Sequence, residues 1–151
     1  MAGRFRQDIR AFVAQGKAQA KPVAITEFGC AAYTGAANMA SRGISDDIEW
    51  DDRGRPLRLK GNLIRDENEQ ARYITELLDV FHTEGVDRAF VYTFARYDLI
   101  DHSEPGKDFD MASAGIVRVL DGERPRRYPD LPWEPKAAFT ALAEFYRALS
   151  R

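Results

Sequence analysis

The chain has a single cysteine, no long hydrophobic run and almost no net charge, and each absence excludes a class of protein. One cysteine, Cys30, in 151 residues excludes an internal disulfide and is typical of a reducing compartment. No apolar run approaches the ~18 residues that a membrane-spanning helix requires. The 22 basic and 24 acidic residues give a net charge of −2, so no overall attraction to a polyanion is expected. These features predict a soluble protein with no membrane or nucleic-acid partner.

The composition is otherwise that of an ordinary globular domain. Apolar residues make up 44% and charged residues 30% of the chain, which argues against disorder. A length of 151 residues suits one domain, residues 1–151, but falls short of the ~250 typical of a complete (β/α)8 barrel. Arg124, Arg126 and Arg127 form a small basic cluster that we interpret as a solvated turn. The opening MAGRFRQDIRAF has no apolar signal-peptide region, so a cytoplasmic location is expected unless the true start lies upstream.

Apolar residues recurring at helical spacing predict three helices. The first covers about residues 3–15. The second begins at a sequence that resembles a capping box, Asp66 with Glu69 three residues later, and ends at Gly85. The third is expected to have Pro135 in its first turn. Its buried face would comprise Phe139, Leu142, Phe145, Tyr146 and Leu149.

Two apolar runs, at 22–28 and 89–94, predict strands on either side of the second helix. Strand–helix–strand in this order is a βαβ unit, whose strands run parallel. The long connection after the first strand contains residues 48–50 and 57–59, which flank DDRGRP and predict a hairpin with Gly54 in its turn. A further extended segment is expected at 115–120.

The first strand ends in a carboxylate, Glu27, which we expect to be poorly solvated at the end of a buried strand. Such a group needs either a partner or a chemical role. Two interpretations remain open from the residues alone. Glu27 is either a catalytic carboxylate or the partner of Arg96 or Arg72 near the strand ends.

Four aromatic residues near the strand ends are candidates for contact with a sugar. Phe94 and Tyr97 follow the second strand, and an aromatic ring can stack on the C–H face of a pyranose; core packing of Phe94 is the alternative. Tyr33 and Trp50 lie in the long connection, where they would cover a ligand. For Trp50, packing within the hairpin is the favoured interpretation.

The loop after the second strand is rich in acidic residues and invites a metal interpretation. Its oxygen donors match no EF-hand or zinc spacing, so turn and cap roles are favoured for Asp108 and Asp110, and His102 is expected to be an exposed loop residue. No metal or cofactor is expected. The remaining members of this set are Asp98, Asp101 and Glu104. Cys30 is expected to be a small buried side chain, and Trp133 to pack at the entry of the last helix.

The phrase KPVAITEFG, residues 21–29, resembles the seventh strand of retaining glycoside hydrolases of the large (β/α)8-barrel clan. In that clan a glutamate at this position is the nucleophile, and the eighth strand ends in an aromatic residue under the sugar, where Phe94 stands here. The segments DFDMASAGIVRVL and YPDLPWEPKAAF, residues 108–120 and 128–139, are similar to bacterial hypothetical proteins related to these enzymes. Some of those carry the label abortive phage infection protein.

The resemblance implies an α/β fold that is the C-terminal segment of a TIM (β/α)8 barrel. The segment would comprise the last two βα units and the preceding helix, and the barrel would be incomplete. Glu27 would be the nucleophile, but the family's acid/base glutamate comes from the fourth strand, which has no counterpart here. A glycoside hydrolase-like chain that binds a carbohydrate but is inactive alone is therefore expected. The alternative is a non-catalytic interaction protein, for example in phage defence.

Two strands with open edges on both sides form an unstable arrangement for a monomer. We therefore expect either a homo-oligomer that closes the sheet or a missing N-terminal chain that completes it.

Overall fold

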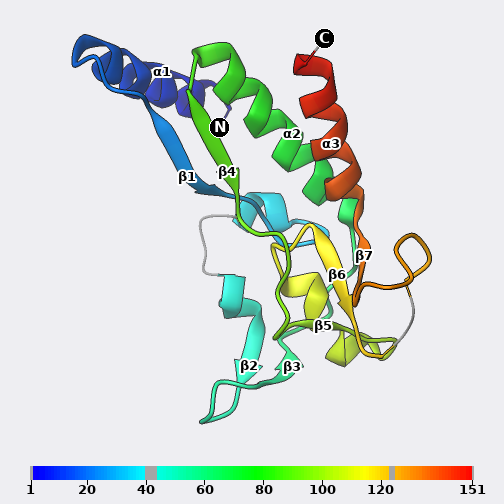
Figure 1. Ribbon diagram of the computed structural model, residues 1–151. Helices are drawn as coiled ribbons and strands as arrows, with labels where there is room; N and C mark the ends of the chain where they lie inside the picture. Colours follow the sequence, from blue (N-terminus) through cyan, green and yellow to red (C-terminus); the bar gives the residue numbers. More distant parts are fainter. Residues whose placement is uncertain (1, 40–43, 123–124, 151) are drawn as a thin grey trace.

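The computed structural model describes residues 2–39, 44–122 and 125–150. Within these residues the protein is a mixed α/β structure with three α-helices and three small sheets, none of them closed (Figure 1). The helices are α1 (Ala2–Ala18), α2 (Glu67–Glu84) and α3 (Ala137–Leu149), and the strands are β1 (Ala24–Phe28), β2 (Ile48–Trp50), β3 (Pro56–Leu59), β4 (Arg88–Val91), β5 (Ile100–Asp101), β6 (Val117–Leu120) and β7 (Trp133–Pro135). Four short 3-10 helices lie in the loops: η1 (Ala36–Met39), η2 (Ile44–Asp47), η3 (Pro105–Lys107) and η4 (Phe109–Ala112). The predicted three helices and βαβ unit are confirmed. The predicted buried face of the third helix is wrong at Tyr146 and Leu149, which are 46% and 47% exposed.

The βαβ unit forms the upper half of the molecule in Figure 1. Strands β1 and β4 pair in parallel, and α1 and α2 pack against them. α3 lies beside α2 (Figure 1). The main core lies between these elements and contains Ile9 and Val13 from α1, Ile74, Leu78 and Phe81 from α2, Val23 and Phe28 from the β1 segment, Ile116 and Val117 near β6, and Ala138 from α3. Helical side chains thus cover one face of the β1–β4 pair.

The other face of the β1–β4 pair is open. Ala24, Thr26 and Glu27 of β1 are exposed, and the ring of Phe90 in β4 is 54% exposed. The expectation that the first strand is buried is therefore wrong. The physical reason is that helices cover only one face, while no described element covers the other.

Helix α2 begins and ends through local hydrogen bonds. The Asp66 carboxylate accepts a hydrogen bond from the Glu69 backbone N–H at 2.9 Å, as the N-cap prediction requires. The reciprocal half of the capping box is absent, because the Glu69 carboxylate accepts hydrogen bonds from the backbone of Gly35 and Ala37 instead. Gly85 ends the helix at φ 79°, a conformation that glycine adopts without a steric penalty.

The lower half consists of the loops that follow β1 and β4. β2 and β3 form the predicted hairpin, in which Asp51 accepts backbone hydrogen bonds across the turn that contains Gly54. β6 confirms the extended segment predicted at 115–120, and it pairs in parallel with β5 and antiparallel with β7. The placement of Pro135 in α3 is wrong. Pro135 belongs to β7 opposite Val117, and the next residue, Lys136, donates its backbone N–H to Ile116, so the helix begins only at Ala137.

Candidate functional site

A β-bulge at the end of β1 sets the position of Glu27. Ile25 pairs with Ala89 and Phe28 pairs with Val91, so three steps along β1 match two steps along β4. The extra residue leaves both Thr26 and Glu27 exposed, while Phe28 returns to the core and packs edge-on against Phe81 at 5.1 Å. Bulges of this kind re-aim side chains and are frequent beside active sites. The bulge therefore turns the Glu27 carboxylate away from the helical core.

The Glu27 side chain makes no hydrogen bond or ion pair with any other described residue. Of its two expected partners, Arg96 instead pairs with Asp98 through two nitrogens, at 2.8 and 2.6 Å. This ion pair raises the pKa of the Arg96 guanidinium and lowers that of the Asp98 carboxyl. Arg72, on α2, is exposed and makes no ion pair in the described part of the chain. Glu27 is thus an exposed carboxylate at the carboxyl end of a parallel strand, and neither expected arginine in the described structure pairs with it.

The candidate aromatic residues are divided between two environments. Phe94 is 43% and Tyr97 60% exposed, so both present ring surface beyond the end of β4. The Phe94 ring also contacts Trp133 edge-on, with centroids 5.2 Å apart. Trp133 in turn packs against Tyr128 and against Phe139 in the first turn of α3. The prediction that Trp133 packs at the entry of the last helix is confirmed.

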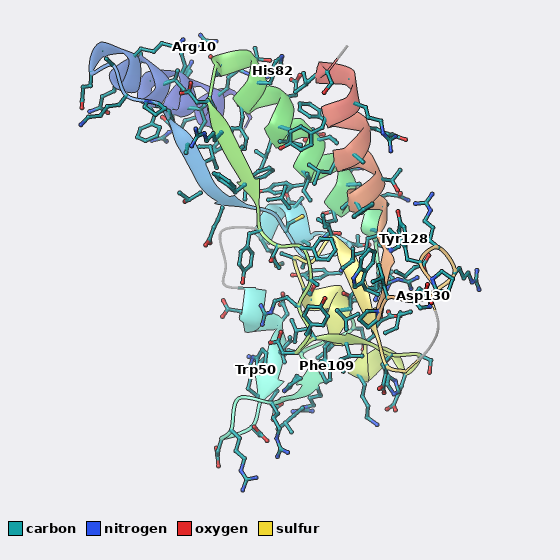
Figure 2. All side chains as sticks on the ribbon, in the orientation of Figure 1. Arg10, Trp50, His82, Phe109, Tyr128 and Asp130 are labelled. Carbon is teal, nitrogen blue, oxygen red and sulfur yellow. The ribbon has the colours of Figure 1, made fainter. Side chains whose placement is uncertain are left out.

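Tyr33 and Trp50 lie in the lower half. Tyr33 is 4% exposed, and its hydroxyl donates a hydrogen bond to Asp47 at 2.6 Å. Trp50 is half-buried and packs, with Phe109, on a second hydrophobic cluster around Ile48 and Leu99; Figure 2 shows Trp50 and Phe109 in the same part of the lower half. The structure therefore presents Phe94 and Tyr97 to solvent but uses Tyr33 and Trp50 in packing.

Three aspartates of the acidic loop form ion pairs with Arg65, which lies just before α2. This cluster was not predicted from the sequence. One Arg65 nitrogen donates to Asp101 at 2.7 Å and to both oxygens of Asp108 at 2.7 Å, and the other donates to Asp110 at 2.9 Å and Glu67 at 3.2 Å. Asp108 and Asp110 are buried. Asp108 stands at the N-cap position of η4 and Asp110 lies within it, so their predicted place in a turn is confirmed. The Asp108 side chain makes no cap hydrogen bond, so the predicted capping is wrong, and the two carboxylates have another role. They neutralise a guanidinium.

The three aspartates of this centre have the spacing of a metal site. Asp101, Asp108 and Asp110 offer carboxylate oxygens within 4.8 Å of one another, a distance that suits a hard cation. The Arg65 guanidinium donates to all three, however, and thus supplies the positive charge that a metal ion would otherwise bring. The arrangement is consistent with a structural role.

Lys136 extends the same centre into the core. Its side chain is 0% exposed and its ammonium lies 2.8 Å from the Asp110 carboxylate, which is 1% exposed. Burial in a low-dielectric environment lowers the pKa of Lys136, and the attraction of Asp110 opposes that shift. Since Lys136 is the N-cap residue directly before α3, this pair fixes the last helix onto η4. Lys136 was not singled out from the sequence, because a lysine before a helix is usually solvated.

Cys30 is 2% exposed, which confirms the prediction of a small buried side chain. Burial, reinforced by the nearby Glu69 carboxylate, raises the pKa of its thiol to about 12. A thiol with this pKa stays protonated near neutral pH, so it is a poor nucleophile there. Of the basic cluster, Arg126 and Arg127 are exposed, and their backbone N–H groups bond to Glu134; Arg124 lies outside the described residues.

Comparison of the chain with models of known protein families finds no match, and no curated protein matches it significantly. Among the described residues, no helix has both the length and the apolar character needed to cross a membrane.

Proposed function

We propose that this chain is the C-terminal segment of a (β/α)8-barrel, glycoside hydrolase-like protein, in which Glu27 is the nucleophile. The observation that carries the proposal is the exposed Glu27 carboxylate, without a partner among the described residues, that a bulge turns outward at the carboxyl end of β1. Active sites of (β/α) barrels lie at this end of the strands. The exposed rings of Phe94 and Tyr97 beyond the neighbouring strand supply apolar surface for a sugar.

The same proposal gives a role to the open face and edges of the β1–β4 pair. Each of these strands has one paired neighbour in the described structure, and the outward ring of Phe90 is 54% exposed. In a closed barrel, further strands pair with the free edges and side chains from the other strands fill the interior. Those strands come either from an N-terminal chain or from other copies of this chain in a homo-oligomer.

Within the part of the chain that the structure describes, no carboxyl group is identified as the general acid for hydrolysis. A retaining glycosidase needs a second carboxyl group ~5 Å from the nucleophile. The buried carboxylates beyond β4, namely Asp108 and Asp110, are both engaged by Arg65, and Asp98 is engaged by Arg96. The acid is therefore expected from the part that completes the barrel.

The experiment uses substrates that do not need an acid. Dinitrophenyl glycosides release a leaving group that departs without protonation, so a nucleophile alone can act on them. We expect the wild-type chain, in its natural assembly, to release dinitrophenolate from at least one glycoside in a panel of common sugars. Glu27→Gln should abolish this release, whereas Glu76→Gln, which changes an exposed glutamate on α2, should leave it unchanged. Release that survives Glu27→Gln would overturn the assignment.

A second candidate function is that of a non-catalytic interaction protein in phage defence. The ion pairs that Arg65 and Arg96 form with the acidic residues favour it. If Asp98, Asp108 and Asp110 only hold the fold, the open β1–β4 face would serve as a binding surface instead. In that case all glycosides stay intact, and Phe90→Asp disrupts assembly with the partner or with a second copy, as measured by sedimentation mass.

A further inference from the structure

Two adjoining cavities lie beside β6, on the side of the molecule away from α1. The first has a volume of about 310 Å³ and is lined by Asp101, His102, Ser103, Arg118, Leu120 and Asp121. The second has a volume of about 350 Å³ and adds Arg126 and Glu134. Since Asp101, Arg118 and Leu120 line both, the two cavities meet at these residues. Their volumes are at the lower end of the ~300–1,000 Å³ range of small-molecule sites.

Arg118 lies at the junction and is held only weakly by its neighbours. One terminal nitrogen lies 3.5 Å from Asp101, and Nε lies 3.7 Å from Glu67 and has no hydrogen-bond partner. A guanidinium has five N–H donors, and those of Arg118 are largely unused within the described structure. Arg65, in contrast, contacts four carboxylates at 2.7 to 3.2 Å. The terminal nitrogens of the Arg118 guanidinium are thus available for another acceptor, whereas its Nε is buried.

The backbone at Arg118 is paired within a strand, opposite Glu134 of β7, which sets the direction of this side chain. Its neighbours in β6, Val117 and Val119, are 0% and 6% exposed and point into the protein. Because side chains alternate along a strand, Arg118 points to the opposite face, where its side chain is 31% exposed. β6 is also the central strand of its sheet, paired on both sides.

The charges around the cavities select the kind of ligand. The carboxylates of Asp101, Asp121 and Glu134 repel an anion, and the guanidinium groups of Arg118 and Arg126 repel a cation. A hydroxyl group suits both, because it donates to a carboxylate and accepts from a guanidinium. Asp101 and Glu134 already accept hydrogen bonds from Arg65 and from the Arg126 backbone. A ligand with neighbouring hydroxyl groups and no charge would bond to their remaining oxygens and to Arg118 at once.

We propose that the paired cavities around Arg118 bind a neutral polyhydroxylated molecule, a sugar ring or a polyol. Arg118 would donate to its hydroxyl oxygens, and Asp101 and Asp121 would accept from its hydroxyl groups. The inference concerns residues of β5, β6 and the loops around them. It goes beyond the assignment of Glu27 and stands whether or not Glu27 is a nucleophile.

The experiment is an NMR titration of the ¹⁵N-labelled wild-type chain. The neutral probes are methyl β-D-glucopyranoside, methyl α-D-mannopyranoside, methyl β-D-xylopyranoside and myo-inositol, and the charged probes are inorganic phosphate and ethylammonium. At least one neutral probe should shift the Arg118 Nε–H signal and the amides of Leu120 and Asp121, while the Glu27 amide stays unchanged. Tighter binding of phosphate or ethylammonium at these signals, or no shift with any neutral probe, would overturn the proposal.

Variants assign the binding to Arg118. Arg118→Met should weaken the neutral probe by about tenfold or more, as expected for hydrogen bonds from a charged group. Arg58→Met, on the exposed hairpin, is the matched control and should leave binding unchanged. Asp121→Asn changes an exposed cavity residue and should weaken binding by about fivefold even if Arg118→Met fails to fold. Unchanged affinity in both cavity variants would contradict the assignment.

Discussion

Glu27, in strand β1, and Asp110, in the 3-10 helix η4, are both carboxylates, yet their surroundings are opposite. Asp110 is 1% exposed, accepts a hydrogen bond from Arg65 at 2.9 Å and forms an ion pair with the Lys136 ammonium at 2.8 Å. Glu27 is exposed and has no partner among the described residues. The difference shows that the ion pairs of Arg65 and Lys136 hold the loops and the last helix together. Glu27 takes no part in these ion pairs among the described residues.

The largest expected effect follows from removing the centre of the ion-pair cluster. Arg65→Met leaves Asp108 and Asp110 buried without their main cation, and an uncompensated buried charge costs about 3–5 kcal/mol of the free energy of unfolding. Urea denaturation measures this loss. Arg58→Met removes an arginine that is 71% exposed and paired with Glu49, and it should change stability by less than about 1 kcal/mol. Similar losses in the two variants would contradict a structural role for the cluster.

Lys136→Met should have the next largest effect, about 3 kcal/mol, because Asp110 then keeps only Arg65. Combining it with Asp110→Asn removes the unpaired charge along with the lysine. The double variant should therefore lose less stability than the sum of the two single variants. Additive losses in this double-mutant cycle would show that the two groups do not interact.

A metal cation should partly replace the Arg65 guanidinium when this side chain is removed. Arg65→Ala leaves Asp101, Asp108 and Asp110 with oxygens within 4.8 Å of one another, a set of hard ligands for Ca²⁺. We expect Ca²⁺ to raise the melting temperature of Arg65→Ala by several degrees, since a ligand that binds only the folded state stabilises it. The wild type, with Arg65 in place, should show no such rise. An equal response of both proteins would indicate binding elsewhere.

Alkaline pH should lower the stability of the folded protein, because Cys30 is buried. Its pKa rises from the ordinary 9.0 to about 12 in the folded protein, so the folded state retains the thiol proton that the unfolded state loses. This contribution to stability is complete below pH 9 and is lost as the pH rises toward 12. At pH 8 iodoacetamide should alkylate Cys30 only after unfolding in guanidinium chloride. Rapid alkylation of the folded protein at pH 8 would show an accessible thiolate.

The smallest expected effect is that of Glu27→Gln on stability. Because the carboxylate is exposed and unpaired, the free energy of unfolding should change by less than about 0.5 kcal/mol. Asp110→Asn, measured beside it by urea denaturation, should cost several times as much. A large loss for Glu27→Gln would mean that Glu27 holds the fold and would remove the basis for a chemical role.

The sequence predicted the regular elements because their signals are local. Helix α2 shows both an N-cap at Asp66 and a left-handed glycine at Gly85, and the hairpin is specified by the turn around Gly54. The short strands β5 and β7, of two and three residues, have no periodic pattern of their own and depend on pairing with β6.

The environments of the charged residues could not be predicted in the same way. The contacts of Arg65 with Asp101 and Asp108 join residues 36 and 43 positions apart, and nothing local to any of them indicates the others. The burial of Lys136 depends on η4, which lies far away in the sequence. The exposure of Glu27 depends on a bulge and on an uncovered sheet face, both of which follow from pairing between distant strands.

Covalent trapping tests the central claim most directly. A 2-deoxy-2-fluoro glycoside with a dinitrophenyl leaving group transfers its sugar to a nucleophilic carboxylate and leaves it attached, without help from an acid. Intact and peptide mass spectrometry of the assembled wild-type protein should find one fluoroglycosyl group on Glu27, and none on Glu27→Gln. A protein that stays unlabelled with every sugar of the panel, or one that is labelled elsewhere and equally in Glu27→Gln, would contradict the claim that Glu27 is the nucleophile.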